Sequence, residues 1–473
     1  MVTVYAGRTD RTAPMTFLAL QALQHRGREG AGLVSQDTDG TLHLLRGRGL
    51  IAEVLSSTQA AALPGSRALG HVRYSTVADE QPQNLQSFVR PTPWGTLGLS
   101  HNGNLRDAPV LSTMLRDAGE QITTTMDSEL LAHLLARALP PADSDPGRRL
   151  TLDELATAAA RAYHDVQGAF SLTLMLGDQL CGVRDRWGIR PLCVGQFPTG
   201  GLIIASETCA LQAAGAQPIY DVAPGELVAI GEGGLQTRRL WPPAAPAPCV
   251  FELIYFARPD SRVFGVDVQA TRQRLGQQLA RELSDDDEFR AGGDGIVVPV
   301  PESGVAAATG LAHALGLPLL PALRQVPDIG RTFLLPSEDL RDRGVRSKLY
   351  LDDAGAAHVR GRHVILVDDS LVRGHTAQQV VAQMRAAGAR RVTLAIASPP
   401  IAWPCYLGID MPEPGELIIN APHNAHDIGQ DRVAAIASRV GADRLRYLSL
   451  AGLQRAVGGD AFCFGCMTGR YPL

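Results

Sequence analysis

The stretch VILVDDSLVRGHT, residues 364–376, runs four apolar residues directly into two carboxylates, Asp368 and Asp369. Such an apolar run predicts a strand that is buried on both faces. Small residues such as Gly374 and Thr376 follow, and they predict a loop that presents backbone N–H groups to an anion as the chain enters a helix. In the plain alternative, one carboxylate caps the turn and the other faces water. The whole stretch predicts a phosphate cradle beside carboxylates that suit ribose hydroxyls or Mg²⁺, as a phosphorylated sugar requires.

Two similar apolar runs occur at 295–300 and 391–398, and a helix-like stretch at 376–389 precedes the second of them. Strands that alternate with helices predict a parallel sheet with helices on its faces. In such sheets, ligands bind beyond the carboxyl ends of the strands. Asp368, Asp369 and the loop after them lie at the carboxyl end of such a predicted strand.

The first 240 residues have a different pattern, with short strand-like segments between turns. Residues 127–139 have helical apolar spacing, and Asp127 at their start predicts an N-cap. The proline-rich segment 241–248 predicts a connector, and 473 residues suit two domains that each bury a core. Strands are predicted at 42–47, 69–76, 96–103, 169–176, 201–206 and 225–230.

The net charge of −4 and the isoelectric point of about 6.3 argue against a nucleic-acid-binding surface or an anionic-membrane surface. No run reaches transmembrane length without proline or charge, and MVTVYAGRTDR lacks a signal-peptide pattern, so a cytoplasmic protein is expected. Seven cysteines suit reduced thiols or a metal site better than a disulfide framework.

Residues 364–376 resemble the phosphoribosyl-pyrophosphate (PRPP) motif of type I phosphoribosyltransferases, and PVPESG (299–304) resembles the pyrophosphate-side loop of that fold. Segments along nearly the whole chain, in order, resemble one family, the glutamine PRPP amidotransferases (amidophosphoribosyltransferases). They are LQHRGREGAG (23–32), GHVRYST (70–76), SHNGNL (100–105), RDRWGIRPL (184–192), ASETCAL (205–211), FELIYFARPDS (251–261), GRTFLLP (330–336), PPIAWPCYLGIDMP (399–412) and FCFGCMTGRYP (462–472).

The resemblance implies an N-terminal-nucleophile αββα sandwich, the class II glutamine amidotransferase domain, over residues 1–240. It implies a type I phosphoribosyltransferase domain with a parallel sheet over 250–450, and a tail with iron–sulfur cysteines over 451–473. The family's enzymes are glycosyltransferases (pentosyltransferases) that form 5-phosphoribosylamine from PRPP and glutamine-derived ammonia, the first step of purine synthesis. Its members form dimers or tetramers, which implies a homo-oligomer.

The family's pattern assigns the ribose hydroxyls to Asp368 and Asp369 and the Mg²⁺ ion to Ser303 and the same two carboxylates. When bound, Mg²⁺ offsets charge on the leaving pyrophosphate, and positioning supplies most of the remaining catalysis. The residues implied in PRPP binding are Asp368, Asp369, Ser370, Arg373, Gly374, His375, Thr376, Arg331 and Lys348.

In the first domain the resemblance implies that Arg73 binds the carboxylate of glutamine and that Asp127 binds its α-amine. Asn102 and Gly103 form the oxyanion hole, where an amide and a backbone N–H stabilise a tetrahedral intermediate. Each residue alone has an ordinary structural explanation, such as a cap or a turn. Their joint order makes them a candidate site.

Cys463 and Cys466 form a C-x-x-C pair, and the iron–sulfur branch of the family draws two more thiolates from the positions of Cys249 and Cys405. Four thiolates from distant segments suit a [4Fe–4S] cluster, with zinc as the chemical alternative. The remaining cysteines, Cys181, Cys193 and Cys209, are expected to be small buried apolar residues.

The chain departs from the family at its start. The family's glutaminase uses an N-terminal cysteine, whereas this chain reads MVTVYAG and has no cysteine before Cys181. Thr3 could replace the thiol only if two residues were removed and the alignment shifted. We therefore expect an inactive glutaminase, with an incomplete or mis-started N-terminus as the rival explanation.

A second departure precedes GRTF, where Gln325, Val326, Pro327 and Asp328 replace the family's Lys-Asn-Arg-Tyr in the loop that joins the two sites. The cations that remain nearby are Arg331, Arg341, Arg343 and Lys348. Arg444 and Arg446 replace Ser and Gly, and nothing in the sequence explains them.

A sugar-phosphate cradle without nucleophile or coupling loop predicts an amidophosphoribosyltransferase-type enzyme that takes free ammonia. One alternative is PRPP-dependent phosphoribosylation of another amine or amide in specialised metabolism. Another is a catalytically silent partner of an active homologue that senses PRPP or nucleotides. A PRPP-responsive repressor is disfavoured because neither half offers a basic DNA-binding module.

Overall fold

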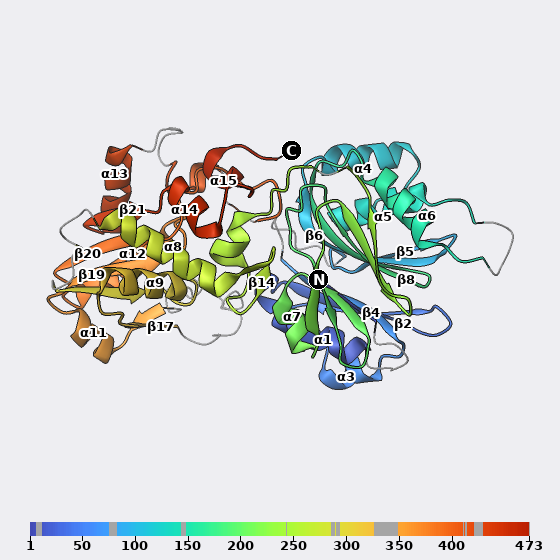
Figure 1. Ribbon diagram of the computed structural model, residues 1–473, viewed down its shortest axis with the longest axis horizontal. Helices are drawn as coiled ribbons and strands as arrows, with labels where there is room; N and C mark the ends of the chain where they lie inside the picture. Colours follow the sequence, from blue (N-terminus) through green and yellow to red (C-terminus); the bar gives the residue numbers. More distant parts are fainter. Residues whose placement is uncertain are drawn as a thin grey trace.

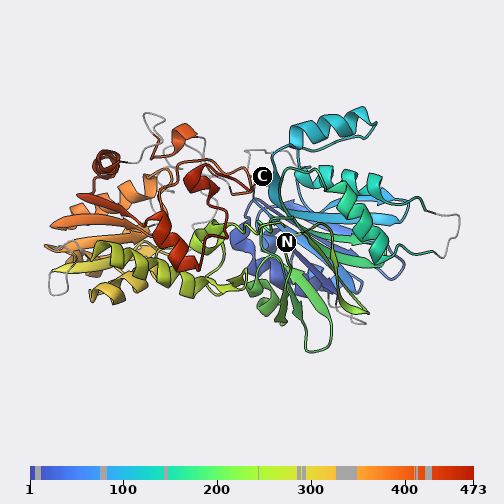
Figure 2. The same ribbon diagram turned by 45° about the horizontal axis from the view of Figure 1, so that its top comes forward.

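The computed structural model describes residues 1–5, 12–74, 83–142, 148–242, 244–284, 289, 294–325, 349–409, 411, 414–420 and 429–472. They form two lobes side by side, each with its own sheets (Figures 1 and 2). The N-terminus lies between the lobes in both views, and the C-terminus returns to the same region.

Two antiparallel sheets form the first lobe. One has seven strands in the order β11-β9-β10-β1-β4-β2-β3, and the other has six in the order β13-β12-β8-β7-β6-β5. The strands are β1 (Val2–Tyr5), β2 (Gly30–Gln36), β3 (Leu42–Arg48), β4 (Arg67–Arg73), β5 (Phe88–Thr92), β6 (Gly95–Leu105), β7 (Gly168–Leu176), β8 (Gln179–Arg184), β9 (Cys193–Gln196), β10 (Leu202–Ala205), β11 (Gln217–Asp221), β12 (Glu226–Gly231) and β13 (Gly234–Arg239).

Apolar residues of both sheets, such as Val34, Leu69, Met175 and Ile204, form the core between them. Helices α1 and α7 cover the outer face of the seven-stranded sheet, and α5 and α6 cover that of the six-stranded sheet. The predicted αββα sandwich is confirmed. Its helices are α1 (Thr12–Ala22), η1 (Gln24–Arg26), α2 (Ile51–Val54), α3 (Ser57–Ala62), α4 (Ala108–Asp117), α5 (Asp127–Ala138), α6 (Leu152–Ala162) and α7 (Thr208–Ala213).

The second lobe contains a parallel sheet in the order β16-β19-β20-β21. Helices α8 and α9 pack on one side, and α12 and α13 on the other. The parallel sheet predicted from the apolar runs is thus confirmed. The elements are η2 (Glu252–Phe256), β14 (Arg262–Val263), β15 (Val266–Asp267), α8 (Val268–Leu283), β16 (Gly295–Pro299), α9 (Val305–Leu315), β17 (Leu323–Gln325), β18 (Leu349–Leu351), α11 (Asp353–Val359), β19 (His363–Asp368), α12 (His375–Ala386), β20 (Arg391–Ile396), η5 (Pro414–Glu416), α13 (Gln430–Val440), β21 (Arg444–Tyr447), α14 (Leu450–Val457) and α15 (Gly465–Thr468).

One local prediction is wrong. The N-cap of α5 is Met126, and Asp127 is the first residue of the helix instead of its cap. The Asp127 carboxylate accepts a hydrogen bond from the N–H of Leu105, on a neighbouring strand, at 2.8 Å. A tertiary partner therefore takes the oxygen that a local cap would have used.

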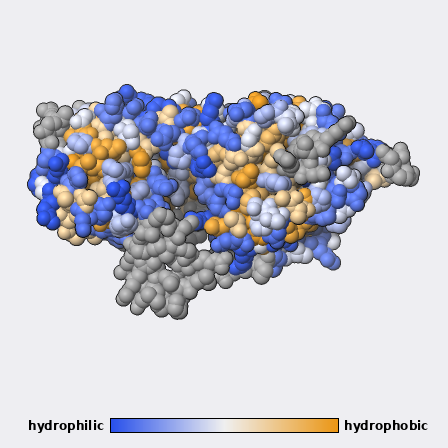
Figure 3. Space-filling view, turned by 90° about the horizontal axis from the view of Figure 1, so that it is seen from below, coloured by the Kyte–Doolittle hydropathy of each residue, from blue (hydrophilic) through white to orange (hydrophobic). Residues whose placement is uncertain are grey.

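Polar and apolar side chains both reach the face in Figure 3, as is usual for folded domains in water. Among the described residues, no helix is long and apolar enough to cross a bilayer.

Candidate active site

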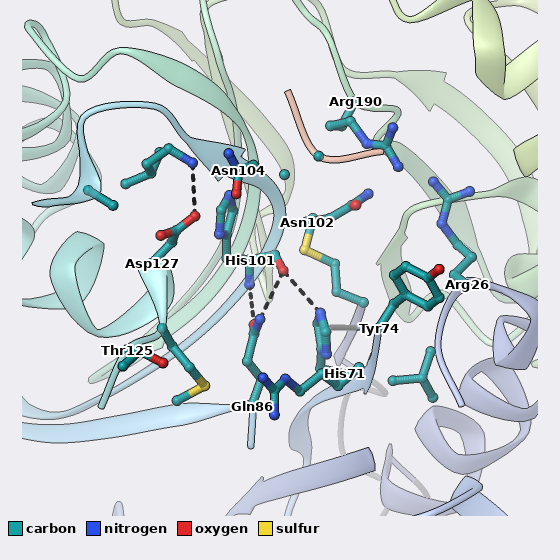
Figure 4. A pocket seen from close by; sticks show the side chains of 18 of the residues that line it. Arg26, His71, Tyr74, Gln86, His101, Asn102, Asn104, Thr125, Asp127 and Arg190 are labelled. Carbon is teal, nitrogen blue, oxygen red and sulfur yellow. Dashed lines mark hydrogen bonds between the residues drawn. The ribbon is translucent and has the colours of Figure 1, made fainter. Parts of the chain in front are cut away.

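A cavity of about 560 Å³ lies in the first lobe beside the second (Figure 4). Three elements of the sandwich bring the predicted glutamine-site residues to it: β4 supplies Arg73, β6 supplies Asn102 and Gly103, and α5 supplies Asp127. The second lobe contributes two residues to the wall. The lining is Met1, Arg26, His71, Val72, Arg73, Tyr74, Gln86, His101, Asn102, Gly103, Asn104, Leu105, Ala108, Thr125, Met126, Asp127, Arg190, Phe256 and Gly408.

Gly103 has φ +151°, a region that favours glycine, and a Cβ there would lie 1.9 Å from the carbonyl oxygen of Ala169. From the second lobe, Gly408 approaches so closely that its own Cβ would lie 2.8 Å from the carbonyl carbon of Gly103. Next to them, the Asn104 side chain donates to the carbonyl oxygen of Tyr406 at 3.1 Å. The second lobe thus packs on the predicted oxyanion hole.

Asp127 lies at the other end of the cavity from Arg190 (Figure 4). Burial raises the pKa of the Asp127 carboxyl to about 6, and the charge of Asp107 adds to the shift, while the hydrogen bond from Leu105 opposes it. A carboxylate in this position gains from a cationic ligand group because such a group would offset the cost of its burial.

Two histidines stand behind the predicted oxyanion hole. The Nε2 atom of His71 lies 3.0 Å from the carbonyl oxygen of His101, and both side chains are buried. Burial lowers the pKa of His101 to about 4 and also lowers that of His71 well below 6.5. Both rings are therefore neutral at physiological pH.

The start of β1 meets the cavity. Met1 is 2% exposed and lines the wall, with its α-amino nitrogen 3.2 Å from Oγ of Ser206. Thr3 points elsewhere, since its hydroxyl donates to the carbonyl oxygen of Ala68 at 2.8 Å within the sheet. No cysteine occurs among the described residues that line this cavity.

A buried ion network joins the lobes beside the cavity. Glu252 of the second lobe lies 2.6 Å from Nη2 of Arg26 and 3.0 Å from Nη2 of Arg190. Arg26 also pairs with Glu207. Burial raises the pKa of Glu207, but the charge of Arg26 outweighs that effect and holds the pKa well below its ordinary value. Both guanidiniums lie over the Phe256 ring, at 4.7 and 5.1 Å from its centroid.

In the second lobe, β19 ends at Asp368, and Asp369 follows it. Ser370 donates to an Asp369 oxygen at 2.5 Å, and Ser303 also bonds to Asp369. Burial raises the pKa of both carboxyls, and the charge of Asp369 raises that of Asp368 further. The two carboxylates and Ser303 thus lie together in a site that a divalent cation or hydroxyl donors would stabilise.

Behind the acidic pair, Gly374 has φ +86° and directly precedes α12, which starts with His375 and Thr376, both exposed. A Cβ on Gly374 would lie 2.4 Å from Cδ1 of Ile418. Exposed backbone N–H groups at a helix start can bind phosphate. Arg373 is also exposed, 3.4 Å from a Glu416 oxygen. Of the other predicted cations and loop substitutions, Val326, Pro327, Asp328, Arg331, Arg341, Arg343 and Lys348 lie outside the described residues.

The four predicted cluster cysteines come together from three segments. The backbones of Cys249 and Cys463 pair in an isolated parallel β-bridge. The carbonyl oxygen of Cys466 accepts hydrogen bonds from the N–H groups of Ala402 and Trp403, which are close to Cys405 in sequence. Burial raises the pKa of Cys466, and the charges of Cys405, Cys249 and Cys463 raise it further. Within the described residues, no three His, Cys, Asp or Glu side chains lie close enough to hold a single metal ion.

Sequence reasoning missed several charged residues of the site. Arg26 and Arg190 occur within the quoted motifs LQHRG and GIRPL, and Glu252 occurs within FELIYF, yet their charges received no role. Glu252 alone offered a signal, because it stands in the apolar segment CVFELIYF, where a charge is buried only with a partner.

Comparisons with known proteins agree with this geometry. A glutamine amidotransferase domain model matches residues 71–213. The chain is 40% identical over 472 residues to an amidophosphoribosyltransferase of Mycobacterium tuberculosis, covering 98% of this chain and 84% of the relative. It is 37% identical over 477 residues to the amidophosphoribosyltransferase of Archaeoglobus fulgidus, covering 100% and 97% of the two chains.

Among solved structures, glutamine PRPP amidotransferase from B. subtilis in complex with ADP and GMP superposes with a TM-score of 0.85 at 35% identity. That comparison covers 100% of this chain and 96% of the other. The identities extend over both lobes, and the matched segments contain both candidate sites. The chain belongs to the amidophosphoribosyltransferase family, whose members are pentosyltransferases.

Proposed function

We propose that this chain forms 5-phosphoribosylamine from PRPP for purine synthesis and takes its nitrogen from free ammonia instead of glutamine. One observation carries the second part: Met1 lines the cavity that also contains Asn102 and Gly103, and no cysteine is among the described lining residues. A thioether has no proton to lose and cannot become the nucleophile that amide hydrolysis by this family requires. The hydroxyl of Thr3 supports the same reading because it is already bonded within the sheet.

In this proposal the second lobe performs the transfer. Asp368 and Asp369 accept hydrogen bonds from the ribose hydroxyls, and the backbone N–H groups at the start of α12 bind the 5-phosphate. Ser303 and the two carboxylates would hold Mg²⁺, which supplies charge neutralisation for the leaving pyrophosphate when bound. The raised pKa values of the two crowded carboxyls support a cation there, because a cation would offset their repulsion.

We further propose a [4Fe–4S] cluster held by Cys249, Cys405, Cys463 and Cys466. The support is a set of four thiols, two buried (Cys249 and Cys466) and two half-buried (Cys405 and Cys463), whose charges act on one another. Iron and sulfide atoms separate the thiolates of a cubane, so its ligands stand further apart than the ligands of one ion. Four thiols drawn from separate segments suit such a cubane, and zinc is the chemical alternative. The family also suggests a dimer or tetramer.

Pyrophosphate release tests the nitrogen source. Anaerobically purified protein is given PRPP and Mg²⁺ with glutamine, with ammonium chloride, or with neither, and intact mass spectrometry establishes its N-terminal residue. Turnover with ammonium that increases as free NH₃ rises with pH, without turnover on glutamine, is expected. Turnover with glutamine would refute the proposal.

A gain-of-function variant sharpens the test. Met1→Cys, produced behind a leader that is cleaved off, places an N-terminal thiol at the same position. Because the rest of the cavity is retained, we expect this variant to release glutamate from glutamine. The matched Met1→Ala variant, which adds no nucleophile, should release none.

A further inference from the structure

We infer that Glu416 sets the affinity of the second lobe for the 5-phosphate of PRPP, by competing with that phosphate for the guanidinium of Arg373. Glu416 stands in η5, more than thirty residues after the acidic pair in the chain, and sequence reasoning assigned it no role. It acts through Arg373 and is therefore a positioning residue for the transfer reaction. The inference rests on the proposed function, because that function assigns the 5-phosphate to the loop before α12.

Arg373 is the cation of the loop between the acidic pair and α12. It directly precedes Gly374, whose φ of +86° turns the chain into the helix, and His375 follows as the first helical residue. The Arg373 side chain is exposed, so the guanidinium can turn without disturbing a packed core. Because a planar guanidinium binds phosphate oxygens in pairs, Arg373 is well suited to hold the 5-phosphate.

The Glu416 carboxylate lies beside the same guanidinium. One of its oxygens is 3.4 Å from Nη2 of Arg373, which makes an ion pair that is longer than a good hydrogen bond. Both side chains are exposed, so solvent screens the pair and keeps it weak. A phosphate group carries more negative charge than one carboxylate and offers three acceptor oxygens. It therefore displaces Glu416 from Arg373, at a cost to its own affinity.

The backbone after Glu416 is fixed to the phosphate loop, so the carboxylate stays close to it. The three residues that follow Glu416 are apolar and buried. The N–H of Ile418 donates to the carbonyl oxygen of Val372 at 2.8 Å, and the Ile418 side chain fills the space that a Cβ on Gly374 would need. Glu416 is thus held two residues from a backbone contact with the neighbour of Arg373.

Removing the carboxylate should strengthen phosphate binding. Glutamine has nearly the same size and shape as glutamate but no charge, so Glu416→Gln frees the guanidinium without altering the packing around it. Exposed charge pairs are weak, and the carboxylate also repels the phosphate at short range, so the expected gain in affinity for PRPP is about three- to tenfold.

Titration calorimetry of the full chain, purified anaerobically and supplied with Mg²⁺ but no ammonium, measures this gain. Glu416→Gln should bind PRPP and ribose 5-phosphate more tightly but pyrophosphate no more tightly, because only the first two carry the 5-phosphate. The matched control is Asp431→Asn, which removes an exposed carboxylate in the first turn of α13 and should change none of the three affinities. Weaker binding of PRPP by Glu416→Gln, or an equal gain for pyrophosphate, would overturn the inference.

A double-mutant cycle shows whether Glu416 acts through Arg373. In an Arg373→Ala background, the gain from Glu416→Gln should shrink to less than about twofold, because no guanidinium remains to compete for. A gain of undiminished size in that background would overturn the competition. Glu416→Asp keeps the charge and should bind PRPP within about twofold of the unmodified protein, whereas a change in shape alone would make it resemble Glu416→Gln.

Steady-state kinetics separate binding from chemistry. In the pyrophosphate-release assay with ammonium, Glu416→Gln should lower KM for PRPP without raising kcat, because the carboxylate acts on the ground-state contact. A change in kcat with KM unaltered would contradict the inference. If the unmodified protein bound neither PRPP nor ribose 5-phosphate, the proposed function would fail and the inference with it. Binding of PRPP with unchanged affinity in Glu416→Gln would overturn the inference alone.

Discussion

Replacing Asp127 by asparagine should make the protein more stable at neutral pH, even though the residue belongs to the candidate site. The folded-state pKa is about 6, against an ordinary value of about 3.9 in unfolded chains. Because the folded pKa is the higher one, the folded state binds the proton more tightly. The carboxyl therefore costs almost nothing below about pH 4, its cost grows as the pH rises from about 4 to about 6, and the cost is constant above that.

The linkage relation converts this difference into roughly 3 kcal/mol at pH 8 and roughly 1.5 kcal/mol at pH 5, as upper values. Asparagine has no charge to bury, and its side-chain oxygen can keep the bond from the Leu105 N–H. We expect the midpoint of thermal unfolding to rise by about 5–10 °C at pH 8 and by about half as much at pH 5.

Circular dichroism melts of the unmodified protein, Asp127→Asn and Asp117→Asn at both pH values provide the assay. Asp117 is exposed, so its replacement should leave the midpoint within about 1 °C. A lower midpoint for Asp127→Asn at pH 8, or a gain that is equal at both pH values, would show that burial of this carboxylate does not destabilise the fold.

Three further changes probe the rest of the molecule. Glu252→Gln leaves Arg26 and Arg190 without their shared counter-charge and should lower the free energy of unfolding by about 3–5 kcal/mol in urea titrations; a loss under 1 kcal/mol would show that the network is not stabilising. Asp368→Asn should weaken PRPP binding about 10- to 100-fold, since a hydrogen bond to a charged group contributes ~1.5–3 kcal/mol, and unchanged calorimetric affinity would contradict its role. Cys466→Ser should remove most of the iron from anaerobically purified protein, whereas Cys181→Ser, buried in another core, should retain it; equal iron in both would exclude the cluster.

The sequence predicted the parallel sheet because its strands are continuous apolar runs, and it located the acidic pair because two charges follow one such run. Asp127 marks the limit of local reasoning. Its place at a helix start predicted a cap, but a strand distant in sequence supplies its hydrogen-bond donor. Arg190 and Glu252 were missed for a related reason, since their roles depend on a contact between lobes.

The close approach of Gly408 to Gly103 has a consequence for how this family's sequences are interpreted. A Cβ on Gly103 would collide with Ala169 and His101 of its own lobe, whereas a Cβ on Gly408 would collide with the backbone of Gly103, so the contact between the lobes needs both glycines regardless of any reaction nearby. A descendant that stopped cleaving glutamine would still have to keep Gly103, because a side chain there would displace the backbone on which Gly408 of the second lobe packs. An oxyanion-hole sequence can therefore be retained for packing between the lobes as well as for catalysis. A pseudoenzyme with this fold would keep the same motif as an active enzyme.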